Sequence, residues 1–572
     1  MLRSTARVRG AQSLALVAIA CADSRGSVDH APALGNAAAL QGATASSLAA
    51  AGFVTSSPRL GTAPRAALSG GQAAPELPRV YLDTKDVPPS GRTIRLGAGG
   101  NLQAALRTAQ PGDEILLASG AVYTGPFILP RKRGPGWITV RTDAAGQLPL
   151  EGVRITPRFA PVLAKLVTST AEPALRTEAG ATGYRITAVE ITVAVPAPRI
   201  NFGLVMLGGG REQTALAQLP ANLVLDRVYV HGTPAADVKT GVTLNSAASA
   251  VIDSYVTDIH VRGQETQAIL MWNGPGPYKI TNNYLASAGE NMMVGGADPA
   301  IPNLIPSDIE VRRNHFFKPM GWRGVYAGVK NSFELKNSRR VLIEGNVFEN
   351  NWVEGQDGFA IVLKSMNQDS GCPWCESSQV TFRLNRIINS PGGVNLVEQR
   401  TSSNGIPVPL NNVLLQNNAF YRIGADGTNG RLFQVAQLVR NITIDHNTGF
   451  APNQLLVFDG GQKPGFAMTN NLFGRGQYGL FGTGGAEGKA ALDAFCPGWV
   501  FQRNAILGAP ARLYPAGNFY PGDPAAVGFA NFAGGDYRLI PGSPYRKAGT
   551  DGKDIGADIA ALDSATAGVV VP

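Results

Sequence analysis

A short pattern, an apolar residue followed by two variable residues and an asparagine, recurs eight times between residues 280 and 504. Its asparagines are Asn283, Asn314, Asn346, Asn385, Asn418, Asn447, Asn471 and Asn504. The apolar residue keeps its offset, whereas neighbouring asparagines lie 24 to 39 residues apart. A fixed local motif with variable spacing is typical of a solenoid with one coil per repeat and loops of different length. The pattern therefore predicts an all-β fold, a single-stranded right-handed parallel β-helix of about a dozen coils.

The repeated asparagine has two physical advantages at the corner of such a coil. It tolerates a left-handed backbone, so we expect it to occupy the sharp turn between two strands. Coils stack about 4.8 Å apart, so side-chain amides in register can also bond to one another. The sequence therefore predicts an asparagine ladder along one corner.

A second series, which precedes the asparagine motifs, alternates with a period of two. Its members are 241–245, 268–272, 291–295, 332–336, 360–364 and 393–397. Such alternation predicts strands with one face in the core and the other outside. The composition agrees with many short strands joined by tight corners, because Gly (69) and Pro (39) are abundant and only 16% of residues are charged.

The ends of the chain are expected to differ from its middle. Residues 1–21 have a basic start and a short apolar run typical of an export signal. Residues 18–21 resemble the cleavage box of bacterial lipoproteins, which would place a lipid on Cys21; a plain cleavable signal is the alternative. Residues 22–79 are rich in Ala, Gly, Ser and Pro and predict a disordered tether.

The ordered part is expected to be one domain, residues 80–560, followed by a tail, 561–572. Residues 101–109 have helical spacing, with Asn101 as the N-cap, and predict a short helix that covers the open end of the solenoid. The Gly- and Asp-rich segment near the C-terminus predicts a closing cap. A calcium site formed by Asp551, Asp554 and Asp558 is the alternative there, and no other cofactor is expected.

The repeat form and the N-terminal helix together resemble the pectate-lyase-like superfamily of right-handed parallel β-helices, over roughly residues 92–559. Members of that superfamily include secreted bacterial proteins that act on polysaccharides. The resemblance implies the fold more specifically than any activity, because one fold hosts many functions.

Aligning the second series places its outward residues in two columns. One reads Thr243, Leu270, Met293, Glu334, Val362 and Asn395, and the other reads Asn245, Trp272, Gly295, Lys336, Lys364 and Val397. Lys336 and Lys364 are then neighbours in adjacent coils, with Glu334 on the same face. When two ammonium groups lie this close together, the charge of each disfavours the charge of the other. A lysine driven towards neutrality in this way can act as a general base. These three residues are therefore the candidate catalytic group, and solvated charges on an exposed face are the alternative.

The two lysine strands resemble the catalytic coils of polysaccharide lyases of the chondroitinase B and alginate lyase type. The resemblance implies that Lys336 is the base and that Lys364 takes the place of an arginine, in a β-elimination from a uronic acid. The chain departs from that pattern: Ser365 and Met366 stand where a histidine and a glycine usually follow, and the acidic calcium ligands are not evident before Lys336.

Other residues are candidates for binding a sugar. Trp272, Trp322 and Tyr326 could stack on sugar rings, with buried packing as the equal alternative, and Asn395 lies in an outward column. Asp357 lies in the loop before the Lys364 strand. With Glu354 it would form the carboxylate pair that a glycosidase needs, if the two lie about 5 to 9.5 Å apart.

Composition limits the partners. The net charge of +9 favours an anionic partner only mildly, and no nucleic-acid-binding motif is present. Cys372 and Cys375 are expected to close a small structural disulfide in an oxidising compartment, while the role of Cys496 stays open. No segment after the leader is apolar enough to span a membrane, so contact with one is expected only through a lipid on Cys21.

Three functions therefore remain open, and none is fixed by the fold. The first is a lyase that cleaves an acidic, uronate-containing polysaccharide. The second is a non-catalytic glycan-binding or cell-envelope surface protein, and the third is a glycoside hydrolase. In each case we expect an exported monomer, secreted, periplasmic or on the outer surface of a bacterium, with a polysaccharide as partner.

Overall fold

A computed structural model of the chain describes residues 73–197, 200–400 and 408–570. The chain divides into two units, 1–44 and 45–572, and the described residues all belong to the second. The predicted leader, Cys21 and the tether as far as residue 72 lie outside the described residues.

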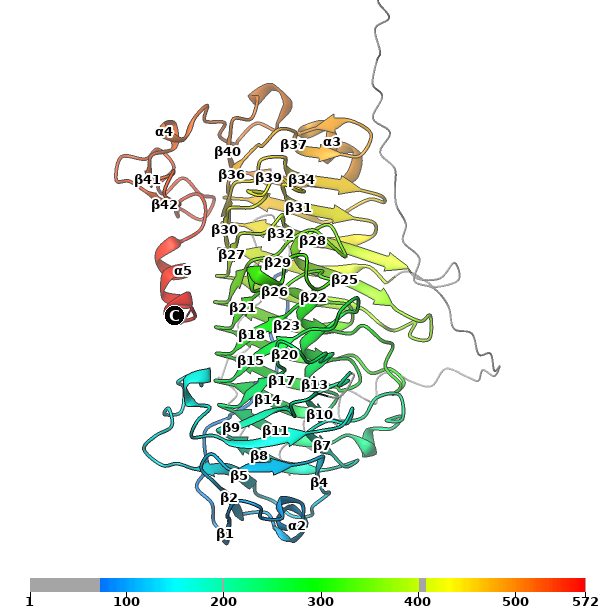
Figure 1. Cartoon of the computed structure of the whole chain (residues 1–572). Coiled ribbons are helices and arrows are strands. Elements are labelled where there is room, and N and C mark those ends of the chain that lie inside the picture. Colours follow the sequence, from blue (N-terminus) through cyan, green and yellow to red (C-terminus); the bar gives the residue numbers. More distant parts are fainter. Residues whose placement is uncertain (1–72, 198–199, 401–407, 571–572) are drawn as a thin grey trace, which may run out of the picture. The chain divides into compact units, whose positions relative to one another are not determined.

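Three long sheets run through the described residues, and each coil contributes one strand to each sheet (Figure 1). Strand pairing in these sheets is parallel throughout, apart from one short antiparallel pair at the end of one sheet. For example, β20 pairs with β23 and β23 pairs with β26, each one coil further along the chain. Parallel sheets whose strands recur every third element confirm the predicted parallel β-helix.

The first sheet, here called the strap sheet, has 14 strands. They are β1 (Thr93–Leu96), β2 (Glu114–Ala118), β5 (Ile138–Asp143), β8 (Thr182–Thr187), β11 (Ala221–Asp226), β14 (Ala247–Ile252), β17 (Gly276–Thr281), β20 (Ser307–Arg312), β23 (Ser338–Glu344), β26 (Ser377–Arg383), β29 (Leu410–Gln416), β32 (Val439–Asp445), β35 (Phe466–Thr469) and β39 (Val500–Gln502).

The second sheet, the tyrosine sheet, has 13 strands. They are β3 (Val122–Thr124), β6 (Ala164–Thr168), β9 (Val189–Val193), β12 (Tyr229–His231), β15 (Tyr255–Ile259), β18 (Tyr284–Ser287), β21 (His315–Phe317), β24 (Val347–Glu349), β27 (Arg386–Ile388), β30 (Ala419–Tyr421), β33 (Thr448–Gly449), β36 (Leu472–Gly474) and β40 (Ala505–Leu507).

The third sheet, the lysine sheet, carries the candidate catalytic residues and also has 13 strands. They are β4 (Phe127–Leu129), β7 (Leu175–Thr177), β10 (Val205–Leu207), β13 (Thr240–Leu244), β16 (Gln267–Met271), β19 (Glu290–Val294), β22 (Phe333–Leu335), β25 (Phe359–Asn367), β28 (Gly392–Arg400), β31 (Arg431–Ala436), β34 (Gln454–Asp459), β37 (Gly479–Gly482) and β38 (Ala486–Glu487).

Helices are few. In the described part of the chain they are α2 (Leu102–Thr108), α3 (Lys489–Phe495), α4 (Pro524–Val527) and α5 (Ile559–Thr566), with 3-10 turns at Pro157–Phe159, Leu216–Gln218, Met320–Trp322 and Ala511–Leu513. Of these helices, α2 lies at the N-terminal end of the solenoid, and α5 lies along its side (Figure 1). The predicted N-terminal helix is confirmed as α2, and its N-cap Asn101 accepts a hydrogen bond from the backbone N–H of Ala104 at 2.9 Å. None of the helices in these ranges is long and apolar enough to cross a membrane.

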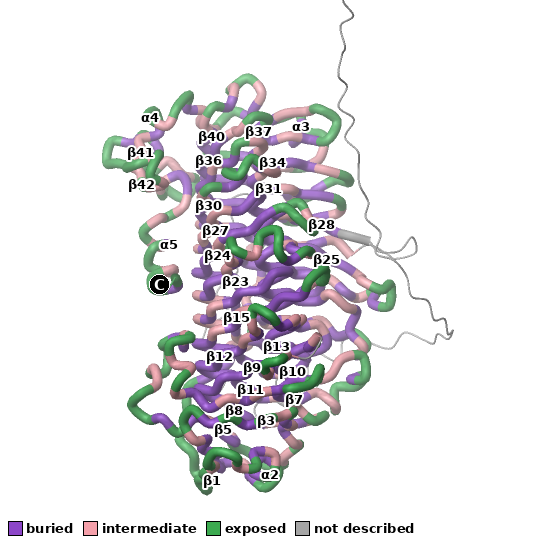
Figure 2. Tube along the Cα trace, in the orientation of Figure 1, coloured by how far each residue is buried: buried purple, intermediate pink, exposed green. Residues whose placement is uncertain are grey.

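The core is the interior of the solenoid, and buried residues follow the strands of successive coils (Figure 2). The rings of Phe316 and Phe348 stack with centroids 4.5 Å apart, and Phe348 stacks in turn on Phe382 at 5.7 Å. Because one aliphatic or aromatic column continues into the next coil, each coil buries its neighbour's apolar face. No single coil could do so alone.

The asparagine ladder is confirmed along one corner. Each ladder asparagine is fully buried, and its carboxamide nitrogen donates to the oxygen of the next one, for example from Asn346 to Asn385 at 3.0 Å. The backbone N–H of Asn346 donates to the same oxygen at 2.9 Å. Asn518, which the eightfold pattern does not include, accepts the same pair of bonds from Asn504 and ends the ladder.

The left-handed backbone at this corner belongs to the residue before each ladder asparagine, so the prediction that the asparagine itself is left-handed was wrong. Leu384 before Asn385 has φ 55°, and His446 before Asn447 has φ 51°. The asparagine instead turns its side chain inward, where it bonds to its neighbours and to a backbone carbonyl. The turn and the ladder bonds are therefore made by two neighbouring residues.

Residues 73–90, here called the strap, cross the outer face of the strap sheet. The backbone N–H of Glu76 donates to Gln379 Oε1 in β26, and that of Arg79 donates to Asp308 Oδ1 in β20, each at 2.8 Å. The strap therefore runs against the stacking order of the coils. Residues 73–79, assigned above to the disordered tether, belong to this ordered segment.

The strap has its own apolar anchor, separate from the solenoid core. Leu82 is 3% exposed and packs on Val224, Ala250 and Ile252, which point outward from β11 and β14. Lys279 donates from its ammonium group to the carbonyl oxygen of Leu82 at 3.2 Å.

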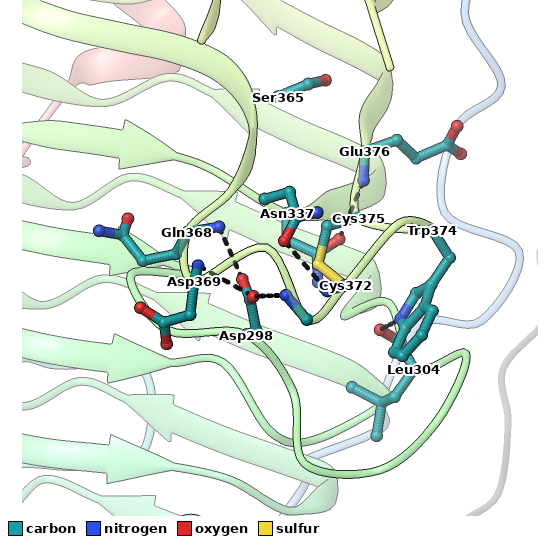
Figure 3. The surroundings of a disulfide bond; sticks show 12 residues. Asp298, Leu304, Asn337, Ser365, Gln368, Asp369, Cys372, Trp374, Cys375 and Glu376 are labelled. Carbon is teal, nitrogen blue, oxygen red and sulfur yellow. Dashed lines mark hydrogen bonds between the residues drawn. A yellow bond between two sulfur atoms is a disulfide. The ribbon is translucent and has the colours of Figure 1, made fainter. Parts of the chain in front are cut away.

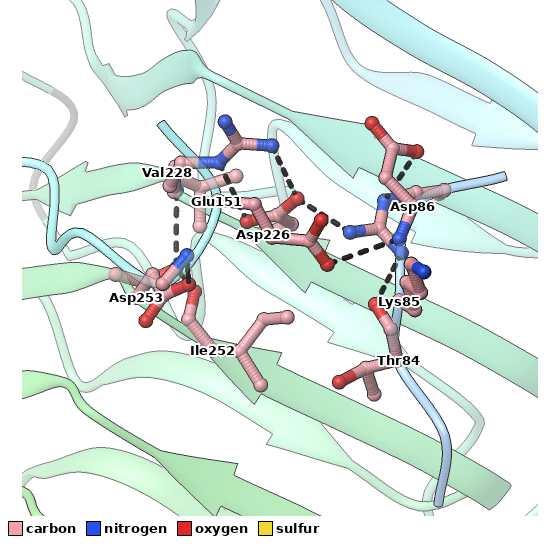
Figure 4. Close-up of polar contacts among 12 residues, drawn as sticks. Thr84, Lys85, Asp86, Glu151, Asp226, Val228, Ile252 and Asp253 are labelled. Carbon is pink, nitrogen blue, oxygen red and sulfur yellow. Dashed lines mark hydrogen bonds and ion pairs between the residues drawn. The ribbon is translucent and has the colours of Figure 1, made fainter. Parts of the chain in front are cut away.

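Buried charges hold the next part of the strap (Figure 4). Arg185 donates to the carbonyl oxygen of Thr84 at 2.8 Å and to the carboxylate of Asp226 at 2.6 Å. Asp226 is fully buried and also accepts from Arg227 at 2.8 Å, while Asp86 of the strap lies 3.4 Å from Arg185. Two guanidinium groups thus compensate one buried carboxylate and tie the strap to β8 and β11.

The solenoid ends earlier than predicted, because the last strands of the three long sheets finish by Leu507. Residues 508–570 contain the antiparallel pair β41 (Phe529–Asn531) and β42 (Asp536–Leu539), followed by α5. Arg386 of β27 forms an ion pair with Asp563 and donates to Thr566, so α5 lies against the tyrosine sheet (Figure 1). The predicted boundary at residue 560 therefore lies inside this helix.

Candidate functional site

The strand register places the two lysines side by side, as the columns predicted. Val294 pairs with Leu335 and Leu335 pairs with Leu363, so Lys336 and Lys364 occupy equivalent positions in adjacent coils. Gly295 holds the same position one coil earlier. A Cβ at Gly295 would lie 2.7 Å from Cβ of Lys336, so only glycine leaves room there for the lysine stem.

Glu334 lies between the two ammonium groups. Its Oε1 lies 2.7 Å from Nζ of Lys364 and 3.8 Å from Nζ of Lys336. Lys364 is therefore held by a charge-assisted contact, whereas Lys336 has only this one distant ion-pair partner among the described residues. The negative charge of Glu334 also offsets the repulsion between the two lysines, which the sequence argument had left uncompensated.

These side chains are more shielded than an exposed strand face would leave them. Glu334 is fully buried, and the side chains of Lys336 and Lys364 are 9% and 8% exposed. Burial raises the pKa of the Glu334 carboxyl, but the charges of Lys364, Lys336 and Lys330 outweigh that effect and lower it to about 2. Glu334 is therefore a permanent anion that positions both ammonium groups.

A second carboxylate, Glu290 at the start of β19, continues this network. It is fully buried, its Oε2 accepts from the amide of Gln267 at 2.9 Å, and its Oε1 lies 3.6 Å from Nζ of Lys330. Lys330 also forms an ion pair with Glu265. Burial, reinforced by the charge of Glu334, raises the pKa of Glu290 to about 7.

Lys318 is the most enclosed of the nearby lysines. It is fully buried, and its ammonium group donates to the carbonyl oxygens of Ser287 and Ala288 at 3.1 Å each and to that of Gly289. Burial lowers the pKa of Lys318 to about 7, against the opposing charge of Glu290. This lysine caps backbone carbonyls and does not reach the outer face.

The residues around Lys336 do not fit a divalent cation. Glu334 is already neutralised by Lys364, and Lys330 lies between Glu290 and Glu265. In the described ranges no cluster of three or more His, Cys, Asp or Glu side chains has a metal-binding arrangement. Ammonium groups thus occupy the places beside these carboxylates.

The carboxylates proposed as calcium ligands near the C-terminus have separate partners. Asp551 lies 3.3 Å from His446, Asp554 accepts from the backbone N–H of Lys547, and Asp558 caps α5. Each serves the terminal cap, which was the preferred interpretation of this segment.

The predicted aromatic residues do not form one platform. Tyr326 is 5% exposed, and its ring stacks on that of His260 with centroids 4.1 Å apart. The hydroxyl oxygen of Tyr326 lies 3.3 Å from Nε2 of His260. The ring face of Tyr326 is therefore not open to a sugar. Trp322 packs its edge against the same histidine at 5.4 Å and stays partly exposed. Trp272 is also partly exposed and follows β16, two coils before Lys336.

The two carboxylates proposed for hydrolysis lie in one exposed loop. Glu354 accepts from the indole nitrogen of Trp352 at 2.9 Å, and Asp357 accepts from Asn429 through its backbone carbonyl at 2.7 Å. Neither is buried. Both carboxylates therefore lack the shielded, apolar surroundings typical of a general acid.

A disulfide loop follows the Lys364 strand. Cys372 and Cys375 are joined in a disulfide and are almost fully buried (Figure 3). The carboxylate of Asp298, three positions after Gly295, accepts from the backbone N–H groups of Gln368 and Asp369 at 2.7 and 2.9 Å. The loops after β19 and β25, two coils apart, are thus fastened together beside the lysines.

The sequence argument missed Glu290, Lys330 and Lys318. The available signal for Glu290 was an acidic residue directly before an apolar strand, Asn291 to Val294. Lys330 lies in a long loop, and Lys318 directly follows a short strand. Nothing in the local sequence distinguishes either from a surface lysine.

No family model matches the chain, and no curated protein matches it either. A mannuronic acid specific polysaccharide family 6 lyase from human gut microbiota is similar in structure, with a TM-score of 0.47 and 12% identity over 76% of this chain and 92% of that one. The family 6 alginate lyase AlyGC has a TM-score of 0.46 and 13% identity over 84% and 59%.

A surface adhesin of Streptococcus pneumoniae, PfbA, has a TM-score of 0.39 and 12% identity over 64% and 85%. At these values the similarity is one of fold and assigns no activity. By its own strand pairing, the chain is a parallel β-helix with a buried lysine–glutamate network on one sheet.

Proposed function

We propose that the chain is a polysaccharide lyase that cleaves an acidic, uronate-containing glycan by β-elimination. The observation that carries the proposal is the unequal sharing of Glu334: its Oε1 lies 2.7 Å from Lys364 but 3.8 Å from Lys336, which has no other ion-pair partner among the described residues. A lysine with weak ion pairing in a shielded place is the better candidate for a group that exchanges a proton.

The reaction needs three events on the sugar: loss of the proton at C5, stabilisation of the carboxylate as negative charge develops, and protonation of the oxygen leaving C4. Lys336 in its neutral form accepts the C5 proton, and a C4–C5 double bond forms as the C4–O bond breaks. The resulting ammonium group returns a proton to the leaving oxygen, so protons balance.

Lys364, held beside Glu334, supplies positive charge that offsets the negative charge developing on the substrate carboxylate. Glu334 acts as a positioning residue, because it holds both lysines through their charges. Export is part of this proposal, since a secreted enzyme meets polysaccharide outside the cell; it rests on the predicted leader and on Cys21.

The test is incubation with alginate, polygalacturonate and glycosaminoglycans while absorbance from an unsaturated product is followed. The wild-type protein should raise the absorbance with at least one of them, and Lys336→Ala should abolish the rise. Lys547→Ala, at an exposed position outside the network, is the matched control. Full activity in Lys336→Ala, or no rise with any substrate, would contradict the proposal.

The second candidate is a non-catalytic glycan-binding surface protein, and the shielding of Lys336 and Lys364 favours it. It predicts sedimentation with a polysaccharide and no product. Hydrolysis has less support, because Asp357 and Glu354 are exposed; it predicts reducing ends without absorbance, lost in Asp357→Asn.

A further inference from the structure

Asn395 in β28 is a polar side chain without a protein partner. Its amide makes no hydrogen bond with the described residues, although its Oδ1 is buried. A shielded amide that loses its bonds to water and gains none is unfavourable, so such groups usually face a ligand or ordered water. Asn395 lies on the outer face of the lysine sheet, where its register partners are Val362 of β25 and Gln434 of β31.

Arg431, at the start of the next strand, carries a charge that no carboxylate neutralises. Its Nη1 donates to Gln434 Oε1 at 2.9 Å and its Nε to Gln454 Oε1 at 3.3 Å. In the part of the chain that the structure describes, no Asp or Glu lies within ion-pair distance of it. Two of the five guanidinium N–H groups are thus used by neutral amides, which orient the group, and three remain for another acceptor.

The three positions form an oblique line across the lysine sheet. Lys364 pairs with Val397, and Asn395 precedes Val397 by two residues in β28. Asn395 pairs with Gln434, and Arg431 precedes Gln434 by three residues in β31. Each step moves one coil along the solenoid, so Arg431 lies about 10 Å along the axis from Lys364. Glycan units that extend from a sugar held at Lys336 in this direction would meet Asn395 and then Arg431.

We infer that Arg431, oriented by Gln434 and Gln454, forms with Asn395 a binding subsite for a carboxylate-bearing sugar, two to three coils beyond Lys336 on the lysine sheet. A guanidinium group recognises a carboxylate through paired N–H donors, and an amide can both donate to and accept from a sugar hydroxyl. The inference rests on the proposed function for its direction, and it names the substrate class: a glycan with uronates at two or more nearby positions.

The test measures binding rather than turnover. Lys336→Ala protein is titrated calorimetrically with oligomers of mannuronate, guluronate and galacturonate, and with the same oligomers after their carboxyl groups are reduced to alcohols. At least one uronate oligomer should bind, and Arg431→Ala should weaken its binding about 10- to 100-fold. The reduced oligomer should bind weakly and lose little further affinity in Arg431→Ala, because both changes remove the same contact.

Two variants control this experiment. Arg431→Lys keeps the positive charge but lacks the paired N–H donors of the guanidinium group, so it should recover part of the affinity. Its recovery would also show that the strand tolerates substitution. Arg440→Ala removes the same charge from an exposed position on the strap sheet and should leave binding unchanged. Equal binding by Arg431→Ala and its parent, or no binding of any uronate oligomer, overturns the inference. Binding that depends on Arg431 without cleavage by the wild-type protein would overturn the proposed function alone.

Discussion

The ammonium group of Lys364 lies 2.7 Å from Oε1 of Glu334, one coil away on the lysine sheet, and the carboxylate that it contacts is fully buried. Removing a charge from water is unfavourable unless a partner of opposite sign compensates it. Because Lys336 lies 3.8 Å from the same oxygen, Glu334 compensates part of the charge of both lysines.

Glu334→Gln should therefore destabilise the protein strongly. The change removes the anion between two shielded ammonium groups and should lower the free energy of unfolding by about 3 kcal/mol, as for other broken buried ion pairs. Unfolding by urea, followed by circular dichroism, measures the effect. The double variant Glu334→Leu with Lys364→Met should recover part of the loss, because it removes both members of the closest pair. A Glu334→Gln protein as stable as the wild type would contradict this account.

The stability of the protein should also depend on Glu290. Its pKa is about 7 in the folded state, above the ordinary value of about 4.3, so the folded protein holds the proton more tightly than the unfolded chain. This contribution is complete below pH 4 and is lost as the pH rises through 7.

Glu290→Gln is neutral at every pH and lacks this dependence. Between pH 5 and pH 8 its free energy of unfolding should rise relative to that of the wild type by an amount on the order of 1–3 kcal/mol. The thermal midpoint, measured across this pH range, should rise with it. Glu354→Gln, at an exposed position, should follow the wild-type curve. Parallel wild-type and Glu290→Gln curves would mean that Glu290 is ionised throughout.

A substitution at the left-handed corner should stabilise the protein. Leu384 has φ 55°, a conformation that Asn adopts more readily than Leu, and Asn occupies the equivalent place at Asn417 and Asn470. Leu384→Asn should raise the free energy of unfolding by about 0.5–1 kcal/mol. Leu384→Ala removes the same side chain but keeps the strain, so it should not stabilise; equal midpoints for the two variants would refute the explanation.

The fold could be predicted because the asparagine offset is a local signal repeated in every coil. The period-two strands also fixed the register correctly, so the alignment of Lys336 with Lys364 followed from the sequence. The corner conformation was assigned to the wrong residue, because the preceding positions are as different as Leu384, His446 and Arg503 and share no side-chain signal.

The site was less predictable than the fold. The distances from Glu334 to the two lysines depend on side-chain packing, and the shielding depends on loops that the strand pattern does not describe. The sequence left Tyr326 open between sugar stacking and buried packing for this reason: its partner His260 lies 66 residues away in sequence. The strap was missed because Leu82 is a single apolar anchor in a stretch with no periodic pattern.

The strap should be the part of the ordered chain that opens most easily. Residues 74–90 of the strap belong to no strand, and Leu82 is a buried apolar anchor there, so Leu82→Ala should cost about 2–5 kcal/mol of local stability while the solenoid stays folded. Limited trypsin digestion should then cut faster after Arg79 and Lys85, and mass spectrometry would detect new N-termini at Val80 and Asp86. Val87→Ala, at a 55% exposed position, should digest like the wild type. Two results together would contradict this prediction: a lower thermal midpoint of the whole solenoid in Leu82→Ala, and unchanged cleavage in the strap below that midpoint. The strap would then be part of the cooperative core.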